Sequence, residues 1–182
     1  GVTRSYSHYK SPAREKGTKM LKIGGKLWMY TPRTDRKILV AGHLLRQSMM
    51  GSDLSYEDMM EDHKLSNAYA AKLEGYEDFE GTRLAILHLI AYDKKTTYQT
   101  RKAWINPNNK TVLKEERFAK SGKILKRILF KDYEEIAGRI FPRTMIFKDL
   151  LKKNTKTTYK FDVIEFDIEI PGRYFSQSIL KR

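Results

Sequence analysis

The feature that most constrains the fold is a series of short extended segments, rich in β-branched and aromatic residues, between residues 69 and 169. Turn-forming residues separate these segments, and no long helical pattern lies between them. Strands joined by such short connections form antiparallel meanders, whereas parallel strands need helical crossovers. The sequence therefore predicts an antiparallel sheet with strands at residues 69–73, 83–92, 98–105, 111–118, 123–133, 144–150 and 157–169.

The distribution of apolar residues predicts the shape of this sheet. In segment 98–105 both sides are mixed, with Tyr98, Thr100, Lys102 and Trp104 on one side and Gln99, Arg101, Ala103 and Ile105 on the other. A sandwich strand would separate polar from apolar residues more cleanly. We therefore expect a curved, partly open sheet with an apolar concave side. Residues 84–92 are almost continuously apolar except for His88 and are expected at its centre.

The first third of the chain contains a predicted hairpin followed by short helical elements. Residues 1–17 are typical of an exposed lead-in or a strand fragment, and residues 20–23 and 26–30 flank a Gly24-Gly25 turn. Residues 37–41 form another β-branched run, and residues 43–50 predict a short helix or a loop. Ser55 and Asp58 have the spacing of a capping box, which predicts a helix over residues 56–63. No internal repeat is present, so residues 1–182 are interpreted as one mainly β (α+β) domain.

Composition narrows the possible partners. The 36 Lys and Arg residues exceed the 22 Asp and Glu residues, and the formal charge is +14. Nucleic acid, anionic lipid headgroups and acidic proteins would all be attracted by this charge. The basic residues are interspersed with acidic ones and lack the clustering of a nucleic-acid binder, so no nucleic-acid partner is expected. The absence of Cys excludes disulfides, thiolate metal sites and cysteine nucleophiles.

Recognised catalytic motifs are missing. The sequence has no P-loop, Gly-x-Gly-x-x-Gly turn, Gly-x-Ser-x-Gly elbow or His-Glu-x-x-His pair, and its four His residues fall in separate segments. Acidic residues between Asp53 and Asp62, next to His63, could hold a divalent cation, but no central Gly shapes a calcium loop. The favoured interpretation is that these acids stabilise a helix N-terminus. We predict no catalytic residue, metal site or cofactor.

Methionine pairs mark one apolar stretch of the chain. Met49-Met50 and Met59-Met60 lie near Leu44, Leu45 and Leu54. Methionine is flexible and polarizable, so it suits surfaces that accommodate variable apolar ligands. Ordinary core packing is the alternative interpretation.

Three sequence blocks carry a family resemblance. Residues 11–22 (SPAREKGTKMLK), 27–32 (LWMYTP) and 47–58 (QSMMGSDLSYED), in this order, resemble the LolA-like outer-membrane lipoprotein-sorting family. Later pieces agree in character, including Trp104-Ile105, residues 131–133 and Ile170-Pro171. The resemblance covers nearly the whole chain, but the helix and first strands that precede the Ser-Pro-Ala-Arg block in the family are not found before Ser11.

The resemblance implies an incomplete, curved antiparallel β-barrel whose concave face is covered by short helices, with a hydrophobic groove between them. It further implies a location in the periplasm or at the outer-membrane periphery. Lipoprotein acyl chains or phospholipid would be the cargo. An envelope exporter or outer-membrane acceptor would be the protein partner. Independently of the resemblance, the positive charge of the chain would serve docking to an anionic membrane surface or to an acidic partner.

We therefore expect a non-enzymatic carrier that holds acyl chains in a hydrophobic groove. The expected groove or lid residues are Trp28, Tyr30, Leu44, Leu45, Met49, Met50, Leu54, Met59 and Met60. Each buried methylene contributes about 0.8 kcal/mol, so a lipid can be held without any catalytic group. The alternative is a non-catalytic accessory or interaction module of an envelope transporter that carries no lipid.

Overall fold

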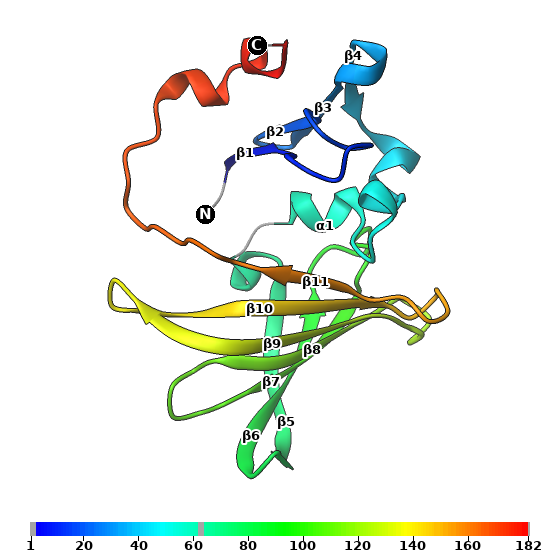
Figure 1. Cartoon of the computed structure of the whole chain (residues 1–182). Helices are drawn as coiled ribbons and strands as arrows, with labels where there is room; N and C mark the ends of the chain where they lie inside the picture. The colour runs from blue at the N-terminus through cyan, green and yellow to red at the C-terminus, as the bar shows by residue number, and fades with distance from the viewer. Residues whose placement is uncertain (1–2, 62–63, 182) are drawn as a thin grey trace. The chain divides into compact units, whose positions relative to one another are not determined.

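The computed structural model describes residues 3–61 and 64–181, which form two antiparallel sheets (Figure 1). The chain divides into two compact units, which are described separately below. Unit 1 comprises Gly1–His63 and Asp167–Arg182, and unit 2 comprises Lys64–Phe166. The interpretation of residues 1–182 as one carrier domain stays a prediction.

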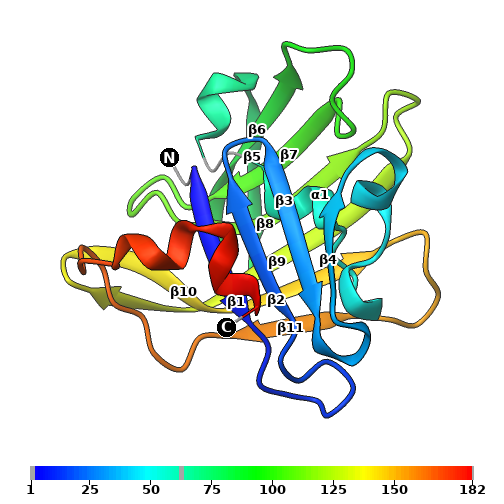
Figure 2. The same ribbon diagram turned by 90° about the horizontal axis from the view of Figure 1, so that it is seen from above.

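Unit 1 is built on a four-stranded sheet in the order β1-β2-β3-β4, whose strands lie side by side in Figure 2. The strands are β1 (Arg4–His8), β2 (Lys19–Ile23), β3 (Lys26–Thr31) and β4 (Arg36–Val40). Ile23 pairs with Lys26 across the Gly24-Gly25 turn, and Gly24 has a φ of 53°. Glycine adopts this left-handed conformation without steric cost. The predicted hairpin is therefore confirmed, and the strand fragment expected within residues 1–17 is β1.

The helical elements of unit 1 are short. The α-helix α1 (Tyr56–Met60) begins with the predicted capping box, in which the Ser55 hydroxyl accepts from the Asp58 backbone N–H and Asp58 accepts from the Ser55 N–H. Its predicted extension to His63 passes into residues outside the described range. The stretch predicted as a short helix or a loop, residues 43–50, contains parts of two short 3-10 helices, with Gln47 and Ser48 between them. The 3-10 segments are Pro32–Thr34, Gly42–Arg46, Met49–Gly51, Gly172–Phe175 and Gln177–Lys181.

Unit 2 is a seven-stranded antiparallel meander in the order β11-β10-β9-β8-β7-β6-β5, preceded by a 3-10 turn at Leu65–Asn67. Its first and last strands are not paired with each other, so the sheet is open, and its strands curve strongly in Figure 1. The strands are β5 (Tyr69–Phe79), β6 (Thr82–Ala91), β7 (Thr100–Ile105), β8 (Val112–Phe118), β9 (Ile124–Ile136), β10 (Arg139–Asp149) and β11 (Thr157–Lys160). The predicted meander is confirmed.

Two expectations about β5 and β6 are wrong. The strand predicted at residues 69–73 is longer than expected, because β5 continues to Phe79 and the reversal uses only Glu80 and Gly81, both with positive φ. Two-residue turns of this kind match the twist of the strands that they join. The apolar strand β6 lies next to the edge strand β5 and not at the sheet centre, which β8 occupies.

The burial of individual residues explains why the apolar run of β6 gave a wrong prediction of its position in the sheet. Leu84 is fully buried on one face and Leu89 on the other, but Ile90 is 49% exposed. A continuous apolar run predicts burial on both faces, and here the two faces are covered at different ends of the strand.

The strand predicted at residues 157–169 is also shorter than expected, because β11 ends at Lys160. The Arg143 guanidinium donates to the carbonyl oxygens of Phe161 and Asp162, at 3.0 and 3.3 Å. The Phe161 backbone N–H still donates to the Arg143 carbonyl oxygen at 3.0 Å, and beyond Phe161 the Arg143 side chain binds the backbone.

The fold class is mainly β with two open antiparallel sheets. Helices covering the concave face of the seven-stranded sheet stay a prediction, because α1 belongs to unit 1. Within residues 3–61 and 64–181, no helix is long and apolar enough to cross a membrane.

Candidate functional site

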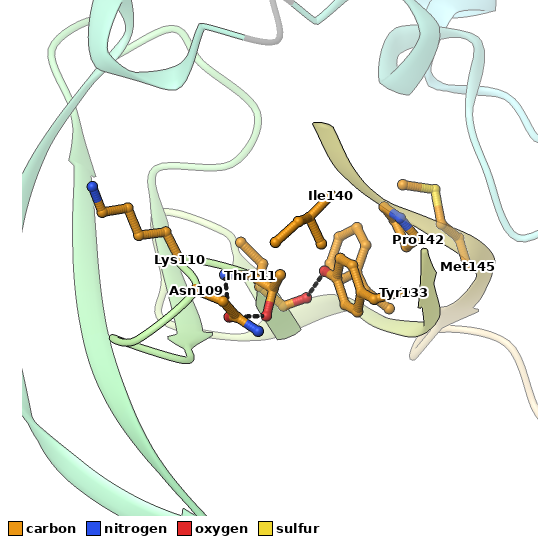
Figure 3. Close-up of a pocket in the computed structure, with 9 residues that line it drawn as sticks. Asn109, Lys110, Thr111, Tyr133, Ile140, Pro142 and Met145 are labelled. Atoms are coloured by element: carbon orange, nitrogen blue, oxygen red, sulfur yellow. Dashed lines mark hydrogen bonds between the residues drawn. The ribbon is translucent and has the colours of Figure 1, made fainter. Parts of the chain in front are cut away.

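The candidate site is a pocket of about 420 Å³ at one end of the unit 2 sheet (Figure 3). Its walls come from the β7–β8 turn and the strands β8, β9 and β10. The polar lining residues lie in the turn and the apolar ones on the strands. They are Asn109, Lys110, Thr111, Val112, Phe130, Tyr133, Ile140, Pro142 and Met145.

Strand register brings the apolar lining together. Phe130 of β9 lies directly opposite Met145 of β10, and Tyr133 lies opposite Pro142. Directly opposed residues of antiparallel strands have Cβ atoms about 5 Å apart, so each pair forms one piece of wall. Ile140 is 47% exposed at the mouth.

The β7–β8 turn forms the polar side of the pocket. The Asn109 carboxamide oxygen accepts hydrogen bonds from the Thr111 backbone N–H at 3.1 Å and from the Thr111 hydroxyl at 2.7 Å. Lys110 has a φ of 61° between them, and its side chain extends away from the Tyr133 ring in Figure 3. The arrangement places one cationic group at the edge of an otherwise mainly apolar pocket.

Tyr133 closes the pocket from β9. Its hydroxyl donates a hydrogen bond to the Val112 carbonyl oxygen of β8 (Figure 3). Burial raises the pKa of the Tyr133 hydroxyl to about 12. The hydroxyl is therefore a neutral donor at physiological pH, and the ring presents an apolar surface to the pocket.

Buried charges lie on the same face of the sheet. Glu115 of β8 is opposite Ile128 of β9, which alternates with Phe130 and therefore shares its face. The Glu115 carboxylate oxygen Oε1 lies 2.9 Å from Arg101 Nη1 and 2.7 Å from Arg117 Nε. Burial would raise the pKa of Glu115, but the positive charges of Arg117 and Arg101 outweigh it and lower that pKa.

Aromatic rings and a second ion pair complete this polar cluster. The Arg101 guanidinium lies 4.6 Å from the Tyr69 ring centroid and 5.4 Å from that of Tyr98. Lys126 Nζ lies 3.2 Å from an Asp149 carboxylate oxygen. Tyr69, Leu89 and Ala103 form the adjoining apolar cluster. This face is therefore a mixture of apolar and paired charged residues, and not purely apolar.

The residues predicted for a groove or lid all lie in unit 1. Met49 and Leu54 are 2% and 6% exposed and belong to its core. The hydroxyl of Tyr9 lies 3.7 Å from Met49 Sδ, and that of Tyr56 lies 3.5 Å from Met29 Sδ. These contacts correspond to the core-packing interpretation of the methionine stretch.

Trp28 and Tyr30 share one face of β3, opposite to that of Met29. The Lys19 ammonium lies 6.0 Å from the Tyr30 ring centroid and donates to the Ile179 carbonyl oxygen. The C-terminal 3-10 turns therefore pack on the Tyr30 face, whereas α1 packs on the Met29 face. The remaining predicted residues, Leu44, Leu45, Met50, Met59 and Met60, are half-buried. Whether any of the nine residues binds a ligand stays a prediction.

Sequence reasoning missed the pocket residues Phe130, Tyr133, Ile140 and Met145. Their only sequence signal is the apolar character of two neighbouring strands. Because a shift of one residue would turn each side chain to the other face, the register decides which of them meet. Among the described residues, no group of three or more His, Asp or Glu side chains could hold a metal ion.

The fold defines a class: a mainly β protein with two open antiparallel sheets, similar in architecture to LolA-like proteins. A LolA superfamily protein from Nitrosomonas europaea superposes with a TM-score of 0.79 and 23% identity, over 98% of this chain and 79% of that chain. A domain described as an outer membrane lipoprotein-sorting protein, from Vibrio parahaemolyticus, superposes with a TM-score of 0.84 and 22% identity, over 98% and 77%.

A DUF1329 family protein from Desulfovibrio piger superposes with a TM-score of 0.88 and 24% identity, over 97% of this chain and 76% of that chain. A family model described as "Uncharacterized protein" matches residues 1–182, and the chain belongs to that family. No curated protein sequence matches the chain. The resemblance to the LolA-like lipoprotein-sorting family, predicted from three sequence blocks, is confirmed.

Proposed function

We propose that this protein is a non-enzymatic carrier that binds acyl chains of lipoproteins or other lipids for outer-membrane sorting. The observation that carries the proposal is the pocket at the end of the unit 2 sheet, lined mainly by apolar and aromatic side chains. Ligand pockets are typically of this kind, with a few polar groups that orient the ligand.

The chemistry of the lining fits a lipid. Phe130, Ile140 and Met145 offer apolar surface to a tail, and Asn109 and Lys110 offer polar contacts to a headgroup at the edge. Each methylene removed from water contributes about 0.8 kcal/mol, so a dozen would contribute on the order of 10 kcal/mol before losses. Burial of this size can keep a lipid tail out of water without any covalent step.

The proposal includes the cellular setting. A sorting carrier would work in the periplasm or at the outer-membrane periphery, and it would receive cargo from an envelope exporter or pass it to an outer-membrane acceptor. The nine residues of unit 1 from Trp28 to Met60 are proposed as additional groove or lid positions. The pocket of unit 2 is the first place to test.

The test is mass spectrometry of organic-solvent extracts from protein purified without detergent. Wild type is expected to yield stoichiometric phospholipid or lipopeptide. Ile140→Asp, which places a carboxylate at the pocket mouth, is expected to lose it because the charge must be desolvated when a tail binds. Ile90→Asp is a matched control, since Ile90 is 49% exposed against 47% for Ile140 and does not line the pocket.

Equal lipid loss in both variants would contradict the pocket assignment. Clean extracts from wild type, together with no binding of a fluorescent fatty acid, would contradict the carrier function. That second outcome would favour the alternative, an accessory or interaction module of an envelope transporter.

A further inference from the structure

One end of the unit 2 sheet carries a concentration of lysines that the carrier pocket does not use. In an antiparallel meander, alternate loops emerge at the same end of the sheet. The β6–β7, β8–β9 and β10–β11 loops, residues 92–99, 119–123 and 150–156, therefore line one end. The β8–β9 and β10–β11 loops can be followed there in Figure 1.

These three loops contain seven lysines and one aspartate, Asp93, which gives a net charge of +6. We define the lysines as the basic rim: Lys94, Lys95, Lys120, Lys123, Lys152, Lys153 and Lys156. All except the half-buried Lys152 are exposed. Successive rim loops are two strands apart, or about 10 Å, which is close to the Debye length at physiological salt. Neighbouring loops therefore act together on a charged surface.

The loops at the opposite end of the same sheet carry no net charge. These loops, residues 80–81, 106–111 and 137–138, contain one acid, Glu80, and one base, Lys110. Lysines placed only for solubility would not need to gather at one end of the strands. The charge asymmetry along the strand direction therefore points to a partner that meets this end.

Two exposed apolar side chains accompany the basic rim. Tyr92 is 65% exposed at the start of the β6–β7 loop, and Leu151 is 58% exposed beside Lys152 and Lys153. Tyrosine is favoured at membrane–water interfaces, and an apolar tip beside lysines can enter the headgroup region.

The loop that carries Leu151 is firmly held. The Leu151 backbone N–H donates to Asp149 Oδ1 at 3.0 Å, and Asp149 Oδ2 lies 3.2 Å from Lys126 Nζ. The Leu150 N–H also donates to the Leu125 carbonyl oxygen at 2.9 Å. The exposed Leu151 side chain therefore projects from a turn that is anchored to β9.

We propose that the basic rim, with Leu151 and Tyr92, docks this protein on an anionic phospholipid bilayer. Clusters of four to eight lysines or arginines bind anionic membrane surfaces, and an apolar side chain adds a second contribution. The docking does not depend on cargo in the pocket, because the rim and the pocket lie at opposite ends of the sheet.

The experiment is co-sedimentation of the full chain with vesicles of phosphatidylcholine plus phosphatidylglycerol, and with vesicles of phosphatidylcholine alone. Wild type is expected to bind the anionic vesicles, less at high salt, and to bind the neutral vesicles weakly. The rim variant K120Q/K123Q/K153Q is expected to bind about 100-fold more weakly, since each lysine near an anionic surface contributes about fivefold.

The matched control is K72Q/K131Q/K160Q, which removes the same charge from exposed positions on β5, β9 and β11. Its binding is expected to stay within a few-fold of wild type. Leu151→Ser keeps the charge and is expected to weaken binding about tenfold. Ile140→Asp, the pocket variant, is expected to bind vesicles as wild type does, so a failed carrier function would not imitate a failed docking surface.

An equal loss of vesicle binding in the rim variant and the control variant would overturn the proposal, because the net charge alone would then explain binding. Equal binding to neutral vesicles would also overturn it, as would unchanged binding of Leu151→Ser. Rim-dependent binding to a DNA oligonucleotide without vesicle binding would assign the surface to nucleic acid instead.

Discussion

Arg101 and Glu115 form an ion pair inside the face of the sheet that holds the pocket, with side chains only 2% and 9% exposed. Arg117 shares the same carboxylate oxygen of Glu115. Glu115 is therefore the common acceptor for two arginines of neighbouring strands. A buried pair of this kind costs desolvation energy, and its removal on one side leaves an uncompensated charge.

Glu115→Gln should therefore destabilise the fold strongly. Two guanidinium groups would lose their shared anion, and we expect a loss of about 3 kcal/mol in the free energy of unfolding. Glu74→Gln is the control, because its ion pair with Lys102 is 34% and 44% exposed and should contribute no more than about 1 kcal/mol. Urea unfolding of the three proteins measures the difference, and similar losses in both variants would contradict the assignment.

The same carboxylate makes stability depend on acid pH. Its pKa in the folded protein is lowered below the ordinary value of 4.5 by Arg117 and Arg101, against the effect of burial. A lowered folded pKa contributes stability that is present above the unfolded pKa and is lost as pH falls through the folded pKa. The stability gap between wild type and Glu115→Gln should hold down to about pH 4.5 and shrink below it. If the difference in the free energy of unfolding stayed constant below pH 4.5, the result would contradict stabilisation by the ion pairs of Glu115.

Tyr133 makes stability depend on alkaline pH. Burial raises the pKa of its hydroxyl from 10.0 to about 12. Because the unfolded chain releases this proton first, the contribution is complete below pH 10 and is lost as pH rises to about 12. Tyr133→Phe should remove this dependence and should cost about 1 kcal/mol at neutral pH through the lost hydrogen bond to Val112. The phenolate absorbance of wild type minus Tyr133→Phe measures the pKa directly, and a value near 10 would contradict burial.

Met50→Asp separates the groove or lid predicted in unit 1 from the pocket of unit 2. If Met50 contacts cargo, the introduced charge should reduce bound lipid as Ile140→Asp does, while the far-UV circular dichroism keeps its β signal. The readout is again lipid in solvent extracts, per mole of protein. Full lipid content in Met50→Asp, with loss in Ile140→Asp, would confine the site to unit 2.

Much of the local structure of this chain could be predicted from its sequence. The Gly24-Gly25 hairpin, the Ser55–Asp58 capping box and the succession of strands in unit 2 all depend on signals within a few residues. Strand ends were less predictable, because contacts distant in sequence form there, as where the Arg143 guanidinium of β10 donates to the carbonyls of Phe161 and Asp162 just after β11. The position of β6 in the sheet could not be read from its apolar run.

The sequence by itself determined the fold class, an antiparallel β protein with a resemblance to the LolA-like family, because alternation, turn residues and three family blocks are local properties. Only the tertiary structure decided the candidate sites. Phe130 meets Met145 through register, and Arg101 meets Glu115 across strands. The sequence did not indicate the basic rim, because its lysines are up to 62 positions apart, from Lys94 to Lys156. Two strands separate successive rim loops in the sequence. In the folded meander, alternate loops return to the same end of the sheet, so their lysines come together.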